Sequence, residues 1–307
     1  MNDFYPEGIL IEKTENAYYF KSVNTLNEAL YDEKIIESRA IVCDADHNLI
    51  VDMGCMKGII PRDEGALGIK EGVVRDIAII SRVNRPVSFI VTAFTRNDNG
   101  ETVAILSRRK AQQKCMDNYI RNLHTGDVIN AKITHLEPFG AFADIGCGIV
   151  SLIPIDTISV SRIEHPCERF SVGMNIKAVI KNMEDGRISL THKELLGTWE
   201  ENARSFRTGE TVAGIIRSVE DYGAFVELTP NLAGLAELKD GITKGCQASV
   251  YIKNIIPERM KIKLIIIDTF EQKYKPTPPV YFFNGHHIDK FIYSPECCQK
   301  TVETVFQ

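Results

Sequence analysis

One short motif occurs twice in this chain and restricts what it can fold into. Residues 139–142 read Phe-Gly-Ala-Phe, and residues 222–225, which lie 83 positions later, read Tyr-Gly-Ala-Phe. The Thr-Gly pair at residues 125–126 recurs at the same offset, at residues 208–209. An offset shared by separate positions marks an internal repeat, so the chain contains at least two copies of one small domain.

The motif predicts a β-surface that carries aromatic rings. Side chains alternate between the two faces of a strand, so rings three residues apart share a face only where the strand is bent or bulged. We expect that bend at Gly140, between the two rings. Two rings on one open β-surface form a stacking platform for unpaired bases. The alternative is a buried hairpin, because a lone pair of phenylalanines usually lies in a core.

The ordered set of segments around the motif resembles the S1 RNA-binding domain, the repeated domain of the largest protein of the bacterial small ribosomal subunit. After the motif, the resemblance continues at residues 151–155, Ser-Leu-Ile-Pro-Ile, and closes at residues 186–190, Gly-Arg-Ile-Ser-Leu. In the second copy, residues 234–238 and 261–264 take these places. The resemblance implies an all-β fold in which each copy is a five-stranded OB-type barrel.

A looser version of the same pattern precedes the two copies. Residues 58–62, 88–94 and 103–108 resemble segments of the domain, but the aromatic pair is absent. About 20 residues around 66–85 also exceed a short OB connection. We therefore expect a divergent first barrel with a structural or protein-contacting role. The expected order is a helical lead-in (1–35), a divergent barrel (36–110), a linker helix (111–123), a second barrel (124–191), a linker helix (192–207), a third barrel (208–268) and an aromatic-rich tail (269–307).

The resemblance also implies which side chains contact RNA. In the second barrel these are Phe139 and Phe142, which stack on bases, and Arg187, which contacts phosphate or stacks its guanidinium plane. Lys132 is a further candidate for positive charge. The matching residues of the third barrel are Tyr222, Phe225 and Lys261.

Three positions depart from the usual pattern of the family. Pro154 and Glu237 stand where a His is common, and Met183 stands where an Asp is common. A carboxylate at residue 237 repels phosphates, so we expect weaker binding in the third barrel than in the second.

The overall charge narrows the choice of partner. The net charge is −5, which disfavours a broad electrostatic grip on duplex DNA but permits single-strand binding by stacking and a few local cations. The common phosphate-binding and catalytic motifs are missing, including Gly-x-x-x-x-Gly-Lys-Ser/Thr, His-Glu-x-x-His and Gly-x-Ser-x-Gly. We therefore expect a protein that is not an enzyme and uses no cofactor.

Cysteine and histidine usage predicts neither disulfides nor a metal site. The eight cysteines are scattered and include no Cys-x-x-Cys pair, which favours thiols in a reducing cytosol. His286-His287 and Cys297-Cys298 are adjacent pairs, whose side chains diverge rather than chelate one ion. Residues 1–8 lack the basic and apolar regions of a signal peptide, and no stretch reaches the length of a membrane span. We expect a cytoplasmic protein without a membrane partner.

The tail is rich in aromatic residues, which argues for docking onto a barrel or a partner rather than for disorder. Within it, Ser294-Pro295-Glu296 predicts the start of a helix, with Ser as the cap and Pro at the first helical position.

The sequence thus predicts a non-catalytic protein that binds single-stranded RNA through tandem OB-type barrels. The chain resembles the short S1 homologues of low-GC Gram-positive bacteria, which implies mRNA binding in translation or near the small ribosomal subunit. Two alternatives remain open. A protein-interaction scaffold is favoured by the acidic net charge and Glu237. An accessory RNA-binding subunit of an RNA-processing complex would need its catalytic partner in trans.

Overall fold

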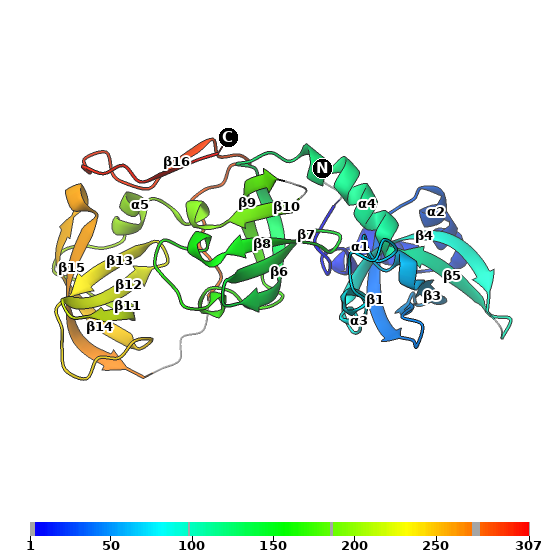
Figure 1. The fold of residues 1–307 in the computed structure, drawn as a ribbon, viewed down its shortest axis with the longest axis horizontal. Coiled ribbons are helices and arrows are strands. Elements are labelled where there is room, and N and C mark those ends of the chain that lie inside the picture. Colours follow the sequence, from blue (N-terminus) through cyan, green and yellow to red (C-terminus); the bar gives the residue numbers. More distant parts are fainter. Residues whose placement is uncertain (1–3, 98, 185–186, 272–276, 307) are drawn as a thin grey trace. The chain divides into compact units, whose positions relative to one another are not determined.

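The computed structural model describes residues 4–97, 99–184, 187–271 and 277–306 (Figure 1). The chain divides into two compact units. One unit holds the residues up to Leu123 together with Asp144–Val150, and the other holds His124–Ala143 and the residues from Ser151 onward. The described residues form three closed five-stranded barrels. The expectation of an all-β chain of tandem OB-type barrels is therefore confirmed.

The first barrel follows a helical lead-in, which comprises η1 (Leu10–Glu12), α1 (Thr14–Tyr19) and α2 (Val23–Tyr31). Its strands are β1 (Ile36–Cys43), β2 (Leu49–Asp52), β3 (Lys57–Ile60), β4 (Pro86–Arg96) and β5 (Thr102–Ser107). The long connection between β3 and β4 contains η2 (Arg62–Glu64) and α3 (Ile77–Ile80). Ile79 of this connection and Leu26 of α2 are fully buried against the barrel core, so both insertions extend that core.

Buried carboxylates anchor the lead-in within its unit. Glu7 accepts from Arg108 at 2.7 Å and from Arg82 at 3.4 Å, and its own backbone N–H donates to Asp144 at 2.7 Å. Glu37 accepts from the backbone N–H groups of Gly8 and Ile11. Burial raises the pKa of Asp144 and of Glu37 to about 7. These groups are paired or hydrogen-bonded, as buried charges must be, and we read them as structural.

The second and third barrels repeat the topology of the first. The second barrel consists of β6 (Val128–Glu137), β7 (Gly140–Gly146), β8 (Ile149–Pro154), β9 (Asn175–Glu184) and β10 (Arg187–Thr191). The third consists of β11 (Thr211–Glu220), β12 (Gly223–Thr229), β13 (Leu232–Ala236), β14 (Gln247–Ile256) and β15 (Lys261–Phe270). In every barrel the third and fifth strands pair in parallel, as in β3 with β5, β8 with β10 and β13 with β15. All three barrels therefore have the same strand order.

Short helices lie between the barrels and in the connections within each barrel. They are α4 (Arg108–Asn118), η3 (Ile120–Asn122), η4 (Ile155–Thr157), η5 (Pro166–Glu168), η6 (Lys193–Leu196), α5 (Trp199–Ala203) and η7 (Pro257–Arg259). Helix α5 is capped by Thr198, whose hydroxyl accepts from the Glu201 N–H while the Glu201 carboxylate accepts from the Thr198 N–H, which forms a capping box. Trp199 is buried in the core cluster of the third barrel, so this linker is packed rather than free.

A buried charge network joins the second barrel to the third inside their common unit. Glu227 of β12 accepts from Arg217 of β11 at 2.7 Å and also from Arg169, which follows η5 of the second barrel. Arg217 pairs in addition with Glu168 of η5. The backbone N–H of Val160 donates to Asn231 Oδ1 at 3.0 Å. The loop before β9 is therefore fixed to the third barrel.

The tail docks onto both barrels of this unit (Figure 1). The Ile288 N–H donates to the Gly126 carbonyl at 2.9 Å, and the Tyr293 hydroxyl donates to the Asn231 carbonyl at 2.6 Å. The His192 ring contacts the Tyr281 ring, and burial lowers the pKa of His192 to about 4.

The prediction of a helix that starts at Ser294 is wrong. The tail instead forms a hairpin of β16 (Lys290–Ile292) and β17 (Glu303–Val305). Ser294 Oγ accepts from the Val302 N–H at 3.0 Å, across the connection between these strands. The serine therefore caps a loop, and cross-strand pairing takes precedence over the local helix signal.

Candidate nucleic-acid interface

The two motifs place their rings in nearly the same arrangement. The ring centroids of Phe139 and Phe142 are 5.9 Å apart at an interplanar angle of 90°, and those of Tyr222 and Phe225 are 6.2 Å apart at 88°. Phe139 is 57% exposed and Tyr222 is 69% exposed, whereas the other ring of each pair is half-buried. Such edge-to-face pairs leave ring surface open to solvent. The alternative of a buried hairpin with two core rings does not describe either pair.

The glycine of each motif is required by a close approach of the neighbouring strand. A Cβ at Gly140 would lie 2.4 Å from the Ile153 carbonyl oxygen, and one at Gly223 would lie 2.6 Å from that of Ala236. The bend expected at the glycine is displaced in the third barrel. There the register shift lies in the preceding strand, β11, between Ile216 and Ser218. The bulge therefore lies in the strand opposite the motif, and Tyr222 lies in the turn that precedes β12.

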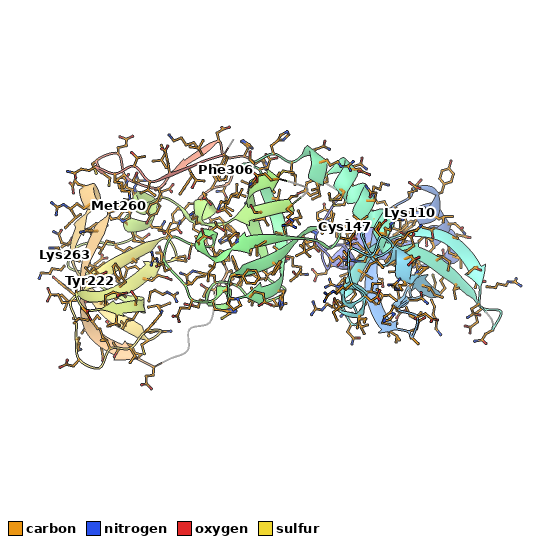
Figure 2. The ribbon with its side chains drawn as sticks, in the orientation of Figure 1. Lys110, Cys147, Tyr222, Met260, Lys263 and Phe306 are labelled. Atoms are coloured by element: carbon orange, nitrogen blue, oxygen red, sulfur yellow. The ribbon has the colours of Figure 1, made fainter. Side chains whose placement is uncertain are left out.

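In the third barrel the inner ring belongs to a row of side chains that crosses four strands. Phe225 lies opposite Leu235, Leu235 lies beside Lys263, and Lys263 lies opposite Asn254. Cross-strand neighbours share a face and neighbouring strands are about 4.8 Å apart, so these four residues form one band, here called the third-barrel row. Tyr222 and Lys263 both lie on the outer surface of this barrel (Figure 2).

Lys261 lies on the same face as this row. It is exposed and precedes Lys263 by two residues on β15, a spacing at which strand side chains share a face. The third barrel therefore presents two ammonium groups on the face that carries Phe225, with β13 between them and that ring. Sequence reasoning named both lysines, Lys261 as a binding residue and Lys263 as a charge that offsets Glu237, but missed Leu235 and Asn254.

The second barrel has a corresponding row. Ser189 lies beside Leu152 and opposite Asn182, and Phe142 stands at the repeat position of Phe225. We call Phe142, Leu152, Ser189 and Asn182 the second-barrel row. Arg187 is exposed, lies opposite Glu184, and precedes Ser189 by two residues on the same face. Gly186, part of the resemblance, lies outside the described residues.

A third ring joins the pair in the second barrel. The His135 ring stacks against Phe142 with a centroid distance of 6.2 Å and an interplanar angle of 29°. Its Nε2 also contacts the Glu137 carboxylate. The equivalent residue of the third barrel is Ser218, which lies opposite Phe225. Sequence reasoning missed His135. The 83-residue repeat offset places His135 at the position of Ser218, and the pairing of Ser218 with Phe225 then places His135 beside Phe142.

The structure does not bring Lys132 to the rings. Lys132 lies opposite Asn175 of β9, three residues before His135 on β6, which corresponds to about 10 Å along a strand. Its side chain is half-buried.

Two of the three departures from the family pattern lie at the end of the third strand, whereas Met183 lies on β9 opposite Ile188. Glu237 directly follows β13, and its carboxylate lies 3.5 Å from the Lys253 ammonium, with both side chains largely exposed. This pair partly neutralises the carboxylate that we expect to repel phosphate. In the second barrel the same position is the uncharged Pro154, whose strand β8 ends there.

The first barrel has a row at the equivalent strand positions, but its side chains are all aliphatic. Ile50 lies opposite Ile59, Ile59 lies beside Ile105, and Ile105 lies opposite Ala93. This row carries neither an aromatic ring nor a charge, in agreement with the aromatic pair missing from the sequence.

The described residues offer neither a metal-ligand cluster nor a membrane-spanning helix. They contain no cluster of three or more His, Cys, Asp or Glu side chains suited to a metal ion. Within the same ranges, no helix combines the length and apolar character needed to cross a membrane.

One family model matches part of the chain. The family model of the S1 RNA binding domain matches residues 122–193, which contain the whole second barrel. The second barrel therefore matches the S1 RNA binding domain, and the first and third barrels repeat its strand order.

The particular relatives are ribosomal. The chain is 29% identical over 264 residues to the small ribosomal subunit protein bS1 of Staphylococcus aureus (strain COL), and the match covers 80% of this chain and 64% of that protein. The bS1 protein of Staphylococcus haemolyticus is 28% identical over 284 residues, with 87% and 69% covered. The resemblance to S1-type proteins of low-GC Gram-positive bacteria is thereby confirmed. The chain spans less than two thirds of the Staphylococcus aureus protein.

One similar solved structure spans most of the chain. It is a multidomain protein with nucleic acid binding domains from Streptococcus pneumoniae, 14% identical, which covers 80% of this chain and 77% of that one at a TM-score of 0.26. At this TM-score the likeness adds nothing to the assignment, which depends on the sequence matches.

Proposed function

We propose that the chain binds single-stranded RNA, without catalysis, through the exposed ring pairs of its second and third barrels. The observation that carries the proposal is the open pair Phe139 and Phe142, which lies inside the segment that matches the S1 RNA binding domain. Bases stack on these rings, each contributing about 1–3 kcal/mol as measured by truncation. Arg187 and Lys261 supply positive charge on the same face from the fifth strand of each barrel, which the third strand separates from the strand of the rings.

The sequence relatives suggest which class of RNA the chain binds. The bS1 proteins are named as components of the small ribosomal subunit. We accordingly propose mRNA as the ligand and the small ribosomal subunit as a partner, with translation as the setting.

We assign the RNA-binding roles to residues 124–191 and 208–268, and a structural or protein-contacting role to residues 36–110. The aliphatic row of the first barrel supports this division, because Ile50, Ile59 and Ile105 offer neither a stacking ring nor a cation. The scaffold alternative is therefore favoured for the first barrel alone.

The test is a titration of labelled single-stranded RNA with the full chain at two salt concentrations. Phe139→Ala/Phe142→Ala should weaken binding at least tenfold, because two stacking surfaces are removed. Tyr31→Ala is the matched control, because Tyr31 is an 88% exposed ring in the lead-in. Its affinity should equal that of the wild type.

Thermal melting of the same variants separates stacking from packing. The double variant should keep the melting temperature of the wild type within a few degrees. A large fall would show that the rings stabilise the core. Absence of RNA binding by the wild type at low salt would overturn the proposal in favour of a protein-interaction scaffold.

A further inference from the structure

A cleft of about 1050 Å³ opens beside the rings of the third barrel. One side is formed by Tyr222 and Phe225, and the other by the second-barrel segment 160–168. Its volume is at the upper end of the range for small-ligand sites, so it accommodates a nucleotide.

We propose that this cleft is a composite nucleotide subsite, in which an unpaired nucleotide stacked on Tyr222 and Phe225 is also bound by Arg162 of the second barrel. The inference rests on the proposed RNA-binding function and makes it more specific. It assigns to the third barrel a binding residue that this barrel does not itself contain.

The wall of the cleft is held in place before any ligand arrives. Glu168, on that wall, pairs with Arg217 of β11, and Arg217 also pairs with the buried Glu227. At the other end of the segment, the Val160 N–H donates to Asn231 and the Ser161 N–H donates to the Pro230 carbonyl. A wall anchored at both ends loses little conformational entropy when a ligand binds.

The charges of the cleft fit a base better than a run of phosphates. Six charged side chains line it, namely Arg162, Glu164, Glu168, Arg217, Glu220 and Lys244. Lys244 pairs with Glu164, and Arg217 pairs with Glu168. Among the ion pairs found in the described residues, none involves Arg162 or Glu220, and both side chains are exposed.

These two groups complement the rings. A guanidinium stacks on a base or donates to its acceptor atoms, and a carboxylate accepts from an exocyclic amino group. The cleft therefore combines a stacking surface, a donor and an acceptor around one nucleotide-sized space. The rings continue directly into this space, which favours RNA over a protein segment as its occupant.

The experiment is a double-mutant cycle on the full chain with a labelled single-stranded RNA long enough to span both barrels. Arg162→Ala should weaken binding about three- to tenfold. Tyr222→Ala should do the same, and the double variant should lose little more than the worse single variant, because both groups hold one nucleotide. Arg162→Ala combined with Phe139→Ala should instead multiply the two losses.

Arg207→Ala is the matched control. Arg207 is an exposed arginine of the linker that lies outside the cleft, so its removal changes the net charge equally and should alter affinity less than twofold. The inference is overturned if Arg162→Ala behaves like Arg207→Ala, or if its loss multiplies with that of Tyr222→Ala.

The two proposals fail in different ways. RNA binding that is abolished in Phe139→Ala/Phe142→Ala but unchanged in Arg162→Ala leaves the proposed function standing and removes only the composite subsite. A wild type that does not bind single-stranded RNA removes both.

Discussion

The second and third barrels build the same row of side chains from different chemistry. The second barrel groups three rings, Phe139, Phe142 and His135, with one cation, Arg187. At its motif the third barrel groups two rings, Tyr222 and Phe225, and it carries two lysines on the same face of β15. A shared backbone therefore yields one surface dominated by stacking and another dominated by charge. Since stacking is insensitive to salt and phosphate attraction is not, the two surfaces should respond differently to ionic strength.

The largest expected effect concerns whether the two barrels form a coupled pair. Glu227→Ala leaves Arg169 and Arg217 buried without their shared carboxylate, which should cost about 3–5 kcal/mol of unfolding free energy. Denaturant unfolding measures this loss. Glu200→Ala, which removes the exposed pair with Arg204, is the control and should cost less than about 1 kcal/mol.

The same Glu227 variant also tests whether the binding surfaces of the second and third barrels depend on each other. If the network fixes the cleft wall, RNA binding through Tyr222 should be impaired while binding through Phe139 and Phe142 persists. Equal stability of Glu227→Ala and Glu200→Ala would mean that the two barrels are independent and that their surfaces act separately.

The next largest effect compares the ring pairs directly. Tyr222→Ala/Phe225→Ala should weaken RNA binding about three- to tenfold, less than the loss of at least tenfold expected for Phe139→Ala/Phe142→Ala. The reason is that the third barrel lacks a ring at the position of His135 and has a carboxylate at Glu237. Parallel titrations of both variants measure the difference. A larger loss from the third-barrel pair would reverse the ranking.

The sequence predicted the two ring pairs, but it did not predict the second-barrel row and the third-barrel row to which Phe142 and Phe225 belong. The spacing of residues 139–142 and the 83-residue offset are local features. Lys263 is linked to Phe225 through Leu235 of β13, with which it pairs in parallel, and Lys263 and Leu235 are 28 residues apart in the chain. Such a register depends on barrel closure, which no local pattern specifies.

Local hydrogen-bond signals predicted some features of the fold, but they failed where strand pairing between distant residues determines the structure. The Thr-x-x-Glu spacing that begins at Thr198 is a local signal for a capping box, and that capping box forms in the structure. Ser294 carries an equally local signal, yet the pairing of β16 with β17 overrides it. Arg162 gave no signal at all, because its place in the cleft depends on how the second-barrel loop is fixed by Arg217 and Glu227.

A smaller effect separates charge from stacking. Lys261→Ala/Lys263→Ala should weaken binding about fivefold at low salt and lower the salt slope by about 1.4, since each phosphate contact with a single strand contributes about 0.7. Arg187→Ala should lower the slope by about half as much. Affinities measured at several salt concentrations give both slopes. Equal slopes for the wild type and the double lysine variant would exclude Lys261 and Lys263 as phosphate contacts.

The smallest effect is a gain. Glu237→Gln removes the carboxylate beside the third-barrel surface and releases Lys253 from a pair at 3.5 Å, so RNA should bind about twofold more tightly at low salt. The gain should disappear at high salt, because screening removes interactions between exposed charges. Glu258→Gln, at an exposed glutamate of η7, makes the same change in net charge and should have less effect. Equal gains from both variants would mean that the third barrel responds to overall charge, and that position 237 does not account for the difference between the two surfaces.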